Sequence, residues 1–162
     1  ISLAYSGYLD RVYEIIEIHI PIPVKVELDE IANYSDKLAK TAKDCLVLLN
    51  QKKIHIYDKQ INTKASKYVS SKINVGEAAC FEQAIEQSSN VIIMDDIPAA
   101  TALYGTAMSK KITIKLSAAA LVELKNQKKI TLNELRKGLE AMIQNRQWGK
   151  SAMESAIRKY FE

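Results

Sequence analysis

Glycine, cysteine and histidine are all scarce in this sequence of 162 residues. Five glycines without a GxGxxG pattern leave no glycine-rich loop that could cradle the phosphates of a nucleotide. The two cysteines, Cys45 and Cys80, fit no metal-binding spacing and lie in apolar helical patterns, so we interpret them as buried, reduced thiols of a cytoplasmic protein. No apolar run reaches about 18 residues and no basic leader opens the chain, so neither a membrane span nor a signal peptide is predicted.

Charge, by contrast, is plentiful but unevenly distributed. Residues 109–162 carry 12 Lys and Arg against 5 Asp and Glu, a net charge of +7 that leaves −3 for the rest of a chain whose total is +4. A basic segment beside a more acidic body suits a phosphate-bearing partner, and a solvated helical surface is the alternative interpretation. The length fits one domain over residues 1–162, with a basic helical segment at about 115–162.

Helices and strands are predicted to alternate along the chain, which is typical of a parallel sheet covered by helices. Strands are predicted at residues 18–22, 53–58, 91–94 and 112–114. Helices are predicted at residues 1–16, from 24 onward, at 33–51, at 77–87, from 98 onward, and at 117–129, 132–145 and 151–161. Residues 58–72 are polar, and a short helix around Ala65 and Val69 is one option. The predicted fold is α/β, a three-layer α/β/α sandwich with a mainly parallel central sheet and extra C-terminal helices.

The stretch Val91–Met108, with the sequence VIIMDDIPAATALYGTAM, is the centre of the prediction. Its first four residues form a short apolar strand, Asp95 and Asp96 follow directly, and Pro98 opens a helical run. A parallel α/β sheet places its chemistry at the carboxyl ends of its strands, where this acidic pair is predicted to lie. The alternative role for either Asp is to cap the free amides of the following helix.

Two further acids are predicted near the same edge of the sheet. Glu27 follows the strand at 18–22, in the first turns of the next helix, and Glu77 opens the helix at 77–87, where a negative charge also favours the helix dipole. Three or four carboxylates at one place repel one another unless a cation is bound. Oxygen ligands with room for water and phosphate suit Mg²⁺ or Mn²⁺, and such sites hydrolyse phosphodiesters. His19 and His55, on two of the predicted strands, are interpreted as structural or surface residues rather than ligands.

At these residues the chain resembles the PIN-domain family of metal-dependent ribonucleases, in the branch with a GE…DD motif. The resemblance spans nearly the whole chain through five segments in the family's order. They are ISLAYSGYLDRV (Ile1–Val12), IPIPVKVEL (Ile20–Leu28), VGEAACFEQA (Val75–Ala84), VIIMDDIPAATA (Val91–Ala102) and ALVELKNQKKI (Ala120–Ile130).

The resemblance assigns roles to the acids. It implies that Glu27, Glu77, Asp95 and Asp96 are catalytic residues and ligands of Mg²⁺ or Mn²⁺. The family's first acid, an Asp of a DTS-type tripeptide on the first strand, is expected a few residues upstream of Ile1. The branch often carries Arg after DD, where this chain has Ala100.

The function implied by the resemblance is a Mg²⁺- or Mn²⁺-dependent endoribonuclease, as the toxin of a toxin–antitoxin pair. Its partners would be RNA, an antitoxin protein and a second copy of the chain in a homodimer, with no membrane. The residues predicted to hold the RNA backbone are Lys125, Lys128, Lys129, Arg136 and Lys137. One alternative is a PIN-fold module that binds RNA or protein without catalysis, and an Asp followed by Ser or Thr upstream of Ile1 would favour the enzyme over it. A flavodoxin-like or other α/β binding domain is disfavoured by the missing glycine-rich loop.

Overall fold

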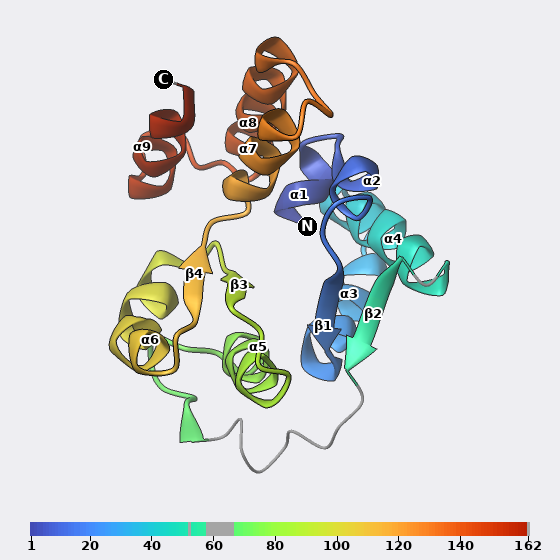
Figure 1. The fold of residues 1–162 in the computed structure, drawn as a ribbon. Helices are drawn as coiled ribbons and strands as arrows, with labels where there is room; N and C mark the ends of the chain where they lie inside the picture. The colour runs from blue at the N-terminus through green and yellow to red at the C-terminus, as the bar shows by residue number, and fades with distance from the viewer. Residues whose placement is uncertain (52, 58–66, 162) are drawn as a thin grey trace. The chain divides into compact units, whose positions relative to one another are not determined.

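The computed structural model describes residues 1–51, 53–57 and 67–161 (Figure 1). The chain divides into two compact units. One unit comprises residues 18–115 and contains the named strands, and the other, residues 1–17 with 116–162, is helical. The predicted helix around Ala65 lies partly outside the described residues. Among the described helices, none has the length and hydropathy needed to cross a bilayer.

Parallel strands and the helices that connect them form the unit of residues 18–115, which confirms the α/β class. Strand β1 (Ile18–Pro21) pairs with β2 (Ile54–Tyr57), and β3 (Val91–Ile93) pairs with β4 (Thr113–Lys115), all in parallel. The named strands thus lie in two sheets of two strands each, and β1 and β3 each have one hydrogen-bonded neighbour among them. The connecting helices are α3 (Ile22–Ala32), α4 (Lys37–Asn50), α5 (Val75–Glu86) and α6 (Ile97–Ser109).

Side-chain caps fix where the helices of this unit begin. Asp36 accepts a hydrogen bond from the Ala39 amide at 2.8 Å, so α4 begins at Lys37, four residues later than the predicted start. Helix α5 begins at Val75, two residues earlier than predicted, because Asn74 is its N-cap. Helix α3 begins at Ile22 rather than after Pro23, since a proline is well tolerated at the second helical position.

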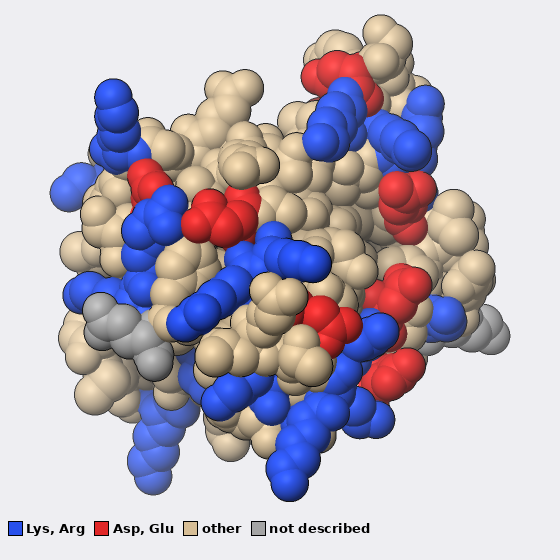
Figure 2. Space-filling model, turned by 90° about the horizontal axis from the view of Figure 1, so that it is seen from above, with Lys and Arg blue, Asp and Glu red and all other residues tan. Residues whose placement is uncertain are grey.

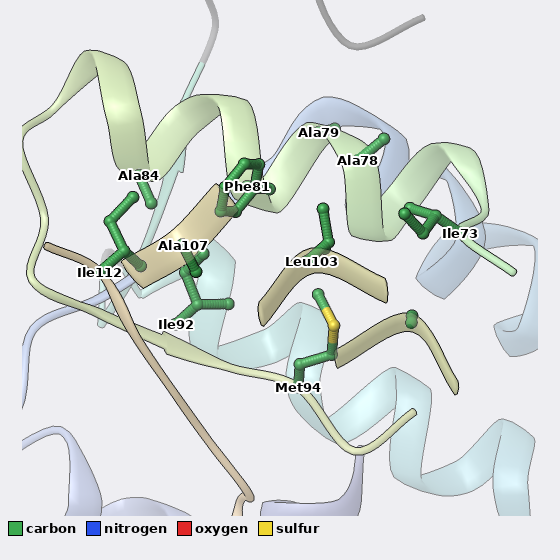
Figure 3. Close-up of a cluster of buried hydrophobic side chains, with 11 residues drawn as sticks. Ile73, Ala78, Ala79, Phe81, Ala84, Ile92, Met94, Leu103, Ala107 and Ile112 are labelled. Carbon is green, nitrogen blue, oxygen red and sulfur yellow. The ribbon is translucent and has the colours of Figure 1, made fainter. Parts of the chain in front are cut away.

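The apolar core of this unit packs α5 against β3 and α6 (Figure 3). Phe81 is fully buried, with Leu103 and Met94 beside it in the same cluster. Helical spacing predicts Ala78, Phe81, Ala84 and Ile85 as the buried face of α5; the first three are buried in the core, and Ile85 packs against it half-buried. This packing holds the N-termini of α5 and α6 and the end of β3 in place, where three of the predicted acids are found.

The helical unit combines both ends of the chain. Its elements are α1 (Ser2–Tyr5), α2 (Leu9–Val12), α7 (Ala118–Asn126), α8 (Leu132–Asn145), α9 (Ala152–Arg158) and the 3₁₀ turn η2 (Lys159–Phe161). A single helix over residues 1–16 was predicted, and this is wrong. Gly7 lies between α1 and α2 at φ +76°, in the left-handed region that an α-helix does not use.

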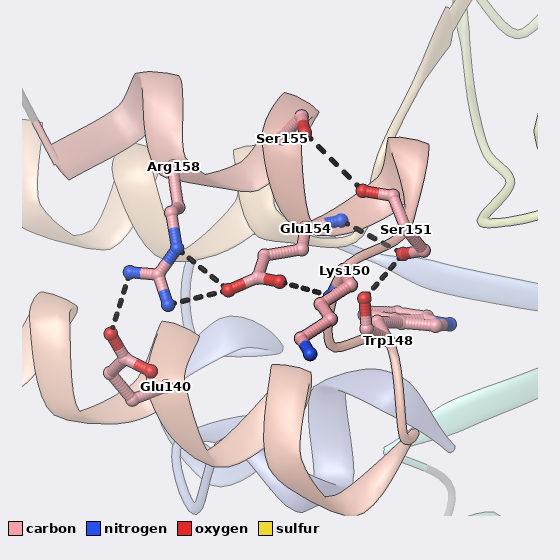
Figure 4. A network of polar contacts seen from close by, with 7 residues as sticks. All are labelled: Glu140, Trp148, Lys150, Ser151, Glu154, Ser155 and Arg158. Atoms are coloured by element: carbon pink, nitrogen blue, oxygen red, sulfur yellow. Dashed lines mark hydrogen bonds and ion pairs between the residues drawn. The ribbon is translucent and has the colours of Figure 1, made fainter.

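Polar contacts connect α8 to α9 (Figure 4). The Arg158 guanidinium lies 2.6 Å from a carboxylate oxygen of Glu154 and 3.0 Å from one of Glu140. Ser151 caps α9 by accepting a hydrogen bond from the Glu154 amide at 3.2 Å. At the start of α8, Thr131 and Glu134 form a capping box, for which Thr131 followed three residues later by Glu134 is the sequence signature.

Four successive helices, α5 to α8, end in the same way although none ends in glycine. The residue after each C-cap has a positive φ, of 55° at Ser88, 58° at Lys111, 59° at Lys128 and 55° at Gln147. The amide of the next residue then donates a hydrogen bond to the carbonyl five residues earlier, as from Ile112 to Ala107 at 2.9 Å. This is the Schellman motif, which satisfies the last free carbonyls of a helix.

Candidate acidic site

The four predicted acids all lie in the unit of residues 18–115. Glu27 is exposed in the middle of α3, and Glu77 is half-buried in the first turn of α5. Asp95 and Asp96 come just after β3, separated from its end by one residue, with Asp95 half-buried and Asp96 exposed.

Glu77 forms one half of a capping box. Its Oε2 accepts a hydrogen bond from the Asn74 amide at 2.8 Å, and its own amide donates to Asn74 Oδ1 at 2.9 Å. These bonds hold the carboxylate at the N-terminus of α5, where the positive end of the helix dipole favours a negative charge. One carboxylate oxygen of Glu77 is engaged in this cap, and the other is not.

Asp96 is the N-cap of α6. Its Oδ1 accepts a hydrogen bond from the Ala99 amide at 2.7 Å, and Pro98 occupies an early helical position where its missing N–H costs nothing. The capping role that the sequence offered as the alternative is therefore present. It leaves the second oxygen of Asp96 outside the cap.

Glu27 approaches the start of α5 over a glycine. A Cβ atom on Gly76 would be tight against Asn74 Oδ1, at 3.3 Å, and in ordinary contact with Glu27 Oε2, at 3.6 Å. The Glu27 carboxylate therefore lies close to the helix end that carries Glu77. Beside them, α3 and the first turn of α5 form a shallow groove of about 540 Å³. Exposed Val26 and Val75 give this groove an apolar lining.

Glu77 is subject to the charges of two other predicted acids. The pKa of Glu77 is raised, first by burial and also by the negative charges of Asp96 and Glu27, against the lowering effect of the Asn74 amide. Burial also raises the pKa of the neighbouring Cys80 thiol to about 12, and the charges of Glu77 and Glu27 add to it. Negative charge from α3 and from the N-cap of α6 thus acts on the first turn of α5.

The described residues contain no three His, Cys, Asp or Glu side chains close enough together to hold one metal ion directly. In ligand type and charge the acids still fit a hydrated hard cation. Mg²⁺ keeps several of its waters when one or two carboxylates bind it, and Glu77 and Asp96 each have an oxygen that is outside the caps.

The predicted RNA-binding residues all belong to the helical unit, and all five are exposed. Lys129 forms an ion pair with Glu14 at 3.7 Å, and Arg136 donates a hydrogen bond to the Phe161 carbonyl at 3.2 Å. Lys125 lies in the last turn of α7, and Lys137 lies on α8. Figure 2 shows one face of the protein, seen from above relative to Figure 1, where acidic side chains lie among the more numerous Lys and Arg.

Sequence reasoning missed a buried acid on α5. Glu82 is 4% exposed, and its Oε2 has no hydrogen-bond partner among the described residues. Helical spacing places Glu82 next to Phe81 but off the apolar face, where a solvated carboxylate is the ordinary expectation. No sequence signal distinguishes it from the exposed acids of the same helix.

Comparison with known proteins agrees with this fold. The family model DUF3368, a PIN domain, matches residues 1–162. The search of curated proteins and the search of solved structures gave no match. Since the family model covers the chain from end to end, the chain belongs to the PIN-domain family, whose fold is of the nuclease type.

Proposed function

We propose that the chain is a Mg²⁺- or Mn²⁺-dependent endoribonuclease that acts through the acids of α3, α5 and the β3–α6 junction. The observation that carries the proposal is the setting of Glu77, whose pKa is raised first by burial and then also by the negative charges of Asp96 and Glu27. Negative charges gathered in this way are a recognised mark of functional sites. Membership of the PIN-domain family supports a nuclease reaction.

In this proposal the acids bind and orient the cation through their uncapped oxygens and through water. The cation, when bound, would lower the pKa of a water molecule and neutralise charge on the phosphate. The helix caps of Glu77 and Asp96 hold these carboxylates in fixed positions, so little side-chain entropy is lost on binding. Asp95, next to Asp96, would position the attacking water or complete the ligand set.

The basic helical unit would hold the RNA backbone. Lys125 and Lys137 are the most informative to replace, because Lys129 and Arg136 also make contacts within their unit. Replacing both with Ala should reduce the slope of log affinity against log salt by about 1.4, because each single-strand phosphate that is no longer neutralised lowers it by about 0.7. Lys43→Ala on α4 is the matched control and should leave the slope unchanged.

Cleavage of a labelled RNA tests the metal proposal directly. The protein is assayed in Mg²⁺ or Mn²⁺, with and without EDTA, as the printed chain and as the longest natural form that contains it. Glu27→Gln, Glu77→Gln and Asp96→Asn should each reduce cleavage at least tenfold. Asp29→Asn removes an acid that pairs with Lys25 on the same helix as Glu27, and it should retain full activity.

Two results would overturn the proposal. Cleavage that survives EDTA would exclude a metal-dependent reaction. If Asp29→Asn lost as much cleavage activity as the three site variants, the loss would reflect the change in overall charge rather than a role of these particular acids.

A second candidate is a PIN-fold module that binds RNA or protein without catalysis. It is favoured by the capping roles of Glu77 and Asp96 and by the lack of three metal-binding side chains close together in the described residues. RNA binding without cleavage by any form of the protein, in either metal, would support this module over the enzyme.

The toxin role, with an antitoxin protein and a homodimer as its partners, belongs to the same proposal. Expression of the active protein should arrest growth of the host cell, whereas Asp96→Asn should not. Growth arrest by both forms would show that toxicity does not depend on the Asp96 carboxylate. Light scattering of the purified chain would test the homodimer.

A further inference from the structure

The chain has only two histidines, and the fold places them side by side. His19 on β1 and His55 on β2 are register partners in the parallel strand pair. Side chains that lie opposite each other on neighbouring strands point to the same face of the sheet. Both residues are exposed, and their rings stack with centroids 5.1 Å apart and planes inclined by 27°.

We propose that His19 and His55 form a bidentate site for Zn²⁺, separate from the acids and independent of the proposed ribonuclease function. A Zn–N bond is about 2.1 Å and the ring centre lies about 1.2 Å behind the nitrogen, so each centroid would be about 3.2 Å from the ion. At the tetrahedral angle two such rings have centroids about 5.2 Å apart. The observed separation, 5.1 Å, is close to this value. The stacked rings do not yet direct their nitrogens at one point, so binding would require the rings to turn about χ2, a torsion with broad preferences.

Ligand chemistry separates this pair from the acidic site. Imidazole nitrogen suits Zn²⁺ and its neighbours in the transition series, whereas carboxylate and water suit Mg²⁺. Since the described residues contain no group of three metal-binding side chains, water would fill the remaining positions and the ion would exchange readily. One nitrogen of each ring would bind the ion, which leaves the other nitrogen for a hydrogen bond that orients the ring.

A bound ion would connect β1 to β2. These two strands form a two-stranded sheet, an arrangement with little stability of its own. A ligand that binds the folded chain alone stabilises it in proportion to the logarithm of its concentration. The melting temperature should therefore rise with Zn²⁺ concentration, and acid should weaken the effect because protons compete for the same nitrogens.

Nitrogen NMR of the imidazole rings provides the direct test, because these are the only two histidines of the chain. In a titration of the ¹⁵N-labelled protein with ZnCl₂ alone, both rings should shift together and saturate at one ion per chain. The same titration of Glu77→Gln should give the same curve, which separates this site from the acids. Rings that shift at different Zn²⁺ concentrations, or do not shift, would overturn the proposal.

Single substitutions provide the second test. His19→Gln and His55→Gln should each lower Zn²⁺ affinity at least tenfold and abolish the thermal stabilisation. Both rings are exposed, so the melting temperature without metal should match that of the parent and show that the variants fold. Unchanged affinity in either folded variant would refute bidentate binding. If one variant fails to fold, the other variant and the NMR titration of the parent still decide the question.

Discussion

Asp96 allows the structural role of an acid to be measured apart from its charge. In Asp96→Ala the amide of Ala99 loses its 2.7 Å hydrogen bond, and Ala99 is fully buried, so water cannot easily replace the lost acceptor. Loss of an N-cap costs about 0.5–2 kcal/mol, and this burial favours the upper half of that range. Asparagine is as good a cap as aspartate, so Asp96→Asn should keep the bond and lose only the negative charge.

The charge effect has the opposite sign and is smaller. Asp96 and Glu77 repel each other, and relief of this repulsion between partly exposed groups is worth less than about 1 kcal/mol. Asp96→Asn should therefore be at least as stable as the parent. Asp96→Ala should be less stable than Asp96→Asn by about 1–2 kcal/mol, and each 1 kcal/mol corresponds to about 2–4 °C in melting temperature.

Urea unfolding followed by far-ultraviolet circular dichroism, in EDTA, measures this difference. Asp44 in the interior of α4 is the control, because there alanine should be the more stable replacement through its higher helix propensity. Equal stability of Asp96→Asn and Asp96→Ala would refute the capping argument. If both variants also lose RNA cleavage while only the alanine variant loses stability, the cap and the proposed metal role belong to the same side chain.

Three further changes test other parts of the structure. Leu103→Ala, at a core position 2% exposed, should lower the free energy of unfolding by about 2–5 kcal/mol and shift the urea midpoint accordingly. Thr131→Ala should cost about 1 kcal/mol by breaking the capping box of α8, whereas Thr131→Ser should retain most of it; equal losses would contradict this. The pKa of Glu77 is raised in the folded chain, so the protonated carboxyl favours the folded state. The stabilisation that results is fully present below the ordinary pKa of 4.5 and is lost as the pH rises through the pKa of the folded chain. The stability of the parent relative to Glu77→Gln should therefore fall from pH 4 to pH 7 in urea titrations without metal, and a rise would contradict the reasoning.

Local chemistry explains which parts of the fold were predictable. Asp36, Asp96 and Thr131 start helices because their side chains accept hydrogen bonds from amides three residues later, and such short-range patterns are visible in the sequence. The strand at Val91–Ile93 and the buried face of α5 follow from apolar periodicity in the same way. The break at Gly7 was missed because the apolar spacing continues across it.

Features that depend on contacts between residues far apart in the chain could not be predicted from the sequence. The stacking of His19 on His55 depends on the register of two strands separated by two helices, and no local pattern sets that register. Glu82 is buried by packing of the rest of the unit, which its own helix does not specify. For the acids, the sequence predicted that charges would gather near strand and helix ends. Their use as helix caps was visible as an alternative, but the effect of burial and of the Asp96 and Glu27 charges on the pKa of Glu77 required the structure.

The helix ends without glycine have a practical consequence for work on this protein. A non-glycine residue in the left-handed region costs about 1 kcal/mol, so the chain carries removable backbone strain at Ser88, Lys111 and Gln147. Glycine at these three positions should raise the free energy of unfolding by a few kcal/mol in total, reduced by the extra entropy of the unfolded glycines, which melting curves would measure. Lys128 is best left in place, since its charge belongs to the proposed RNA surface. A background stabilised in this way would tolerate destabilising substitutions of the acids, so that losses of activity could be measured on folded protein.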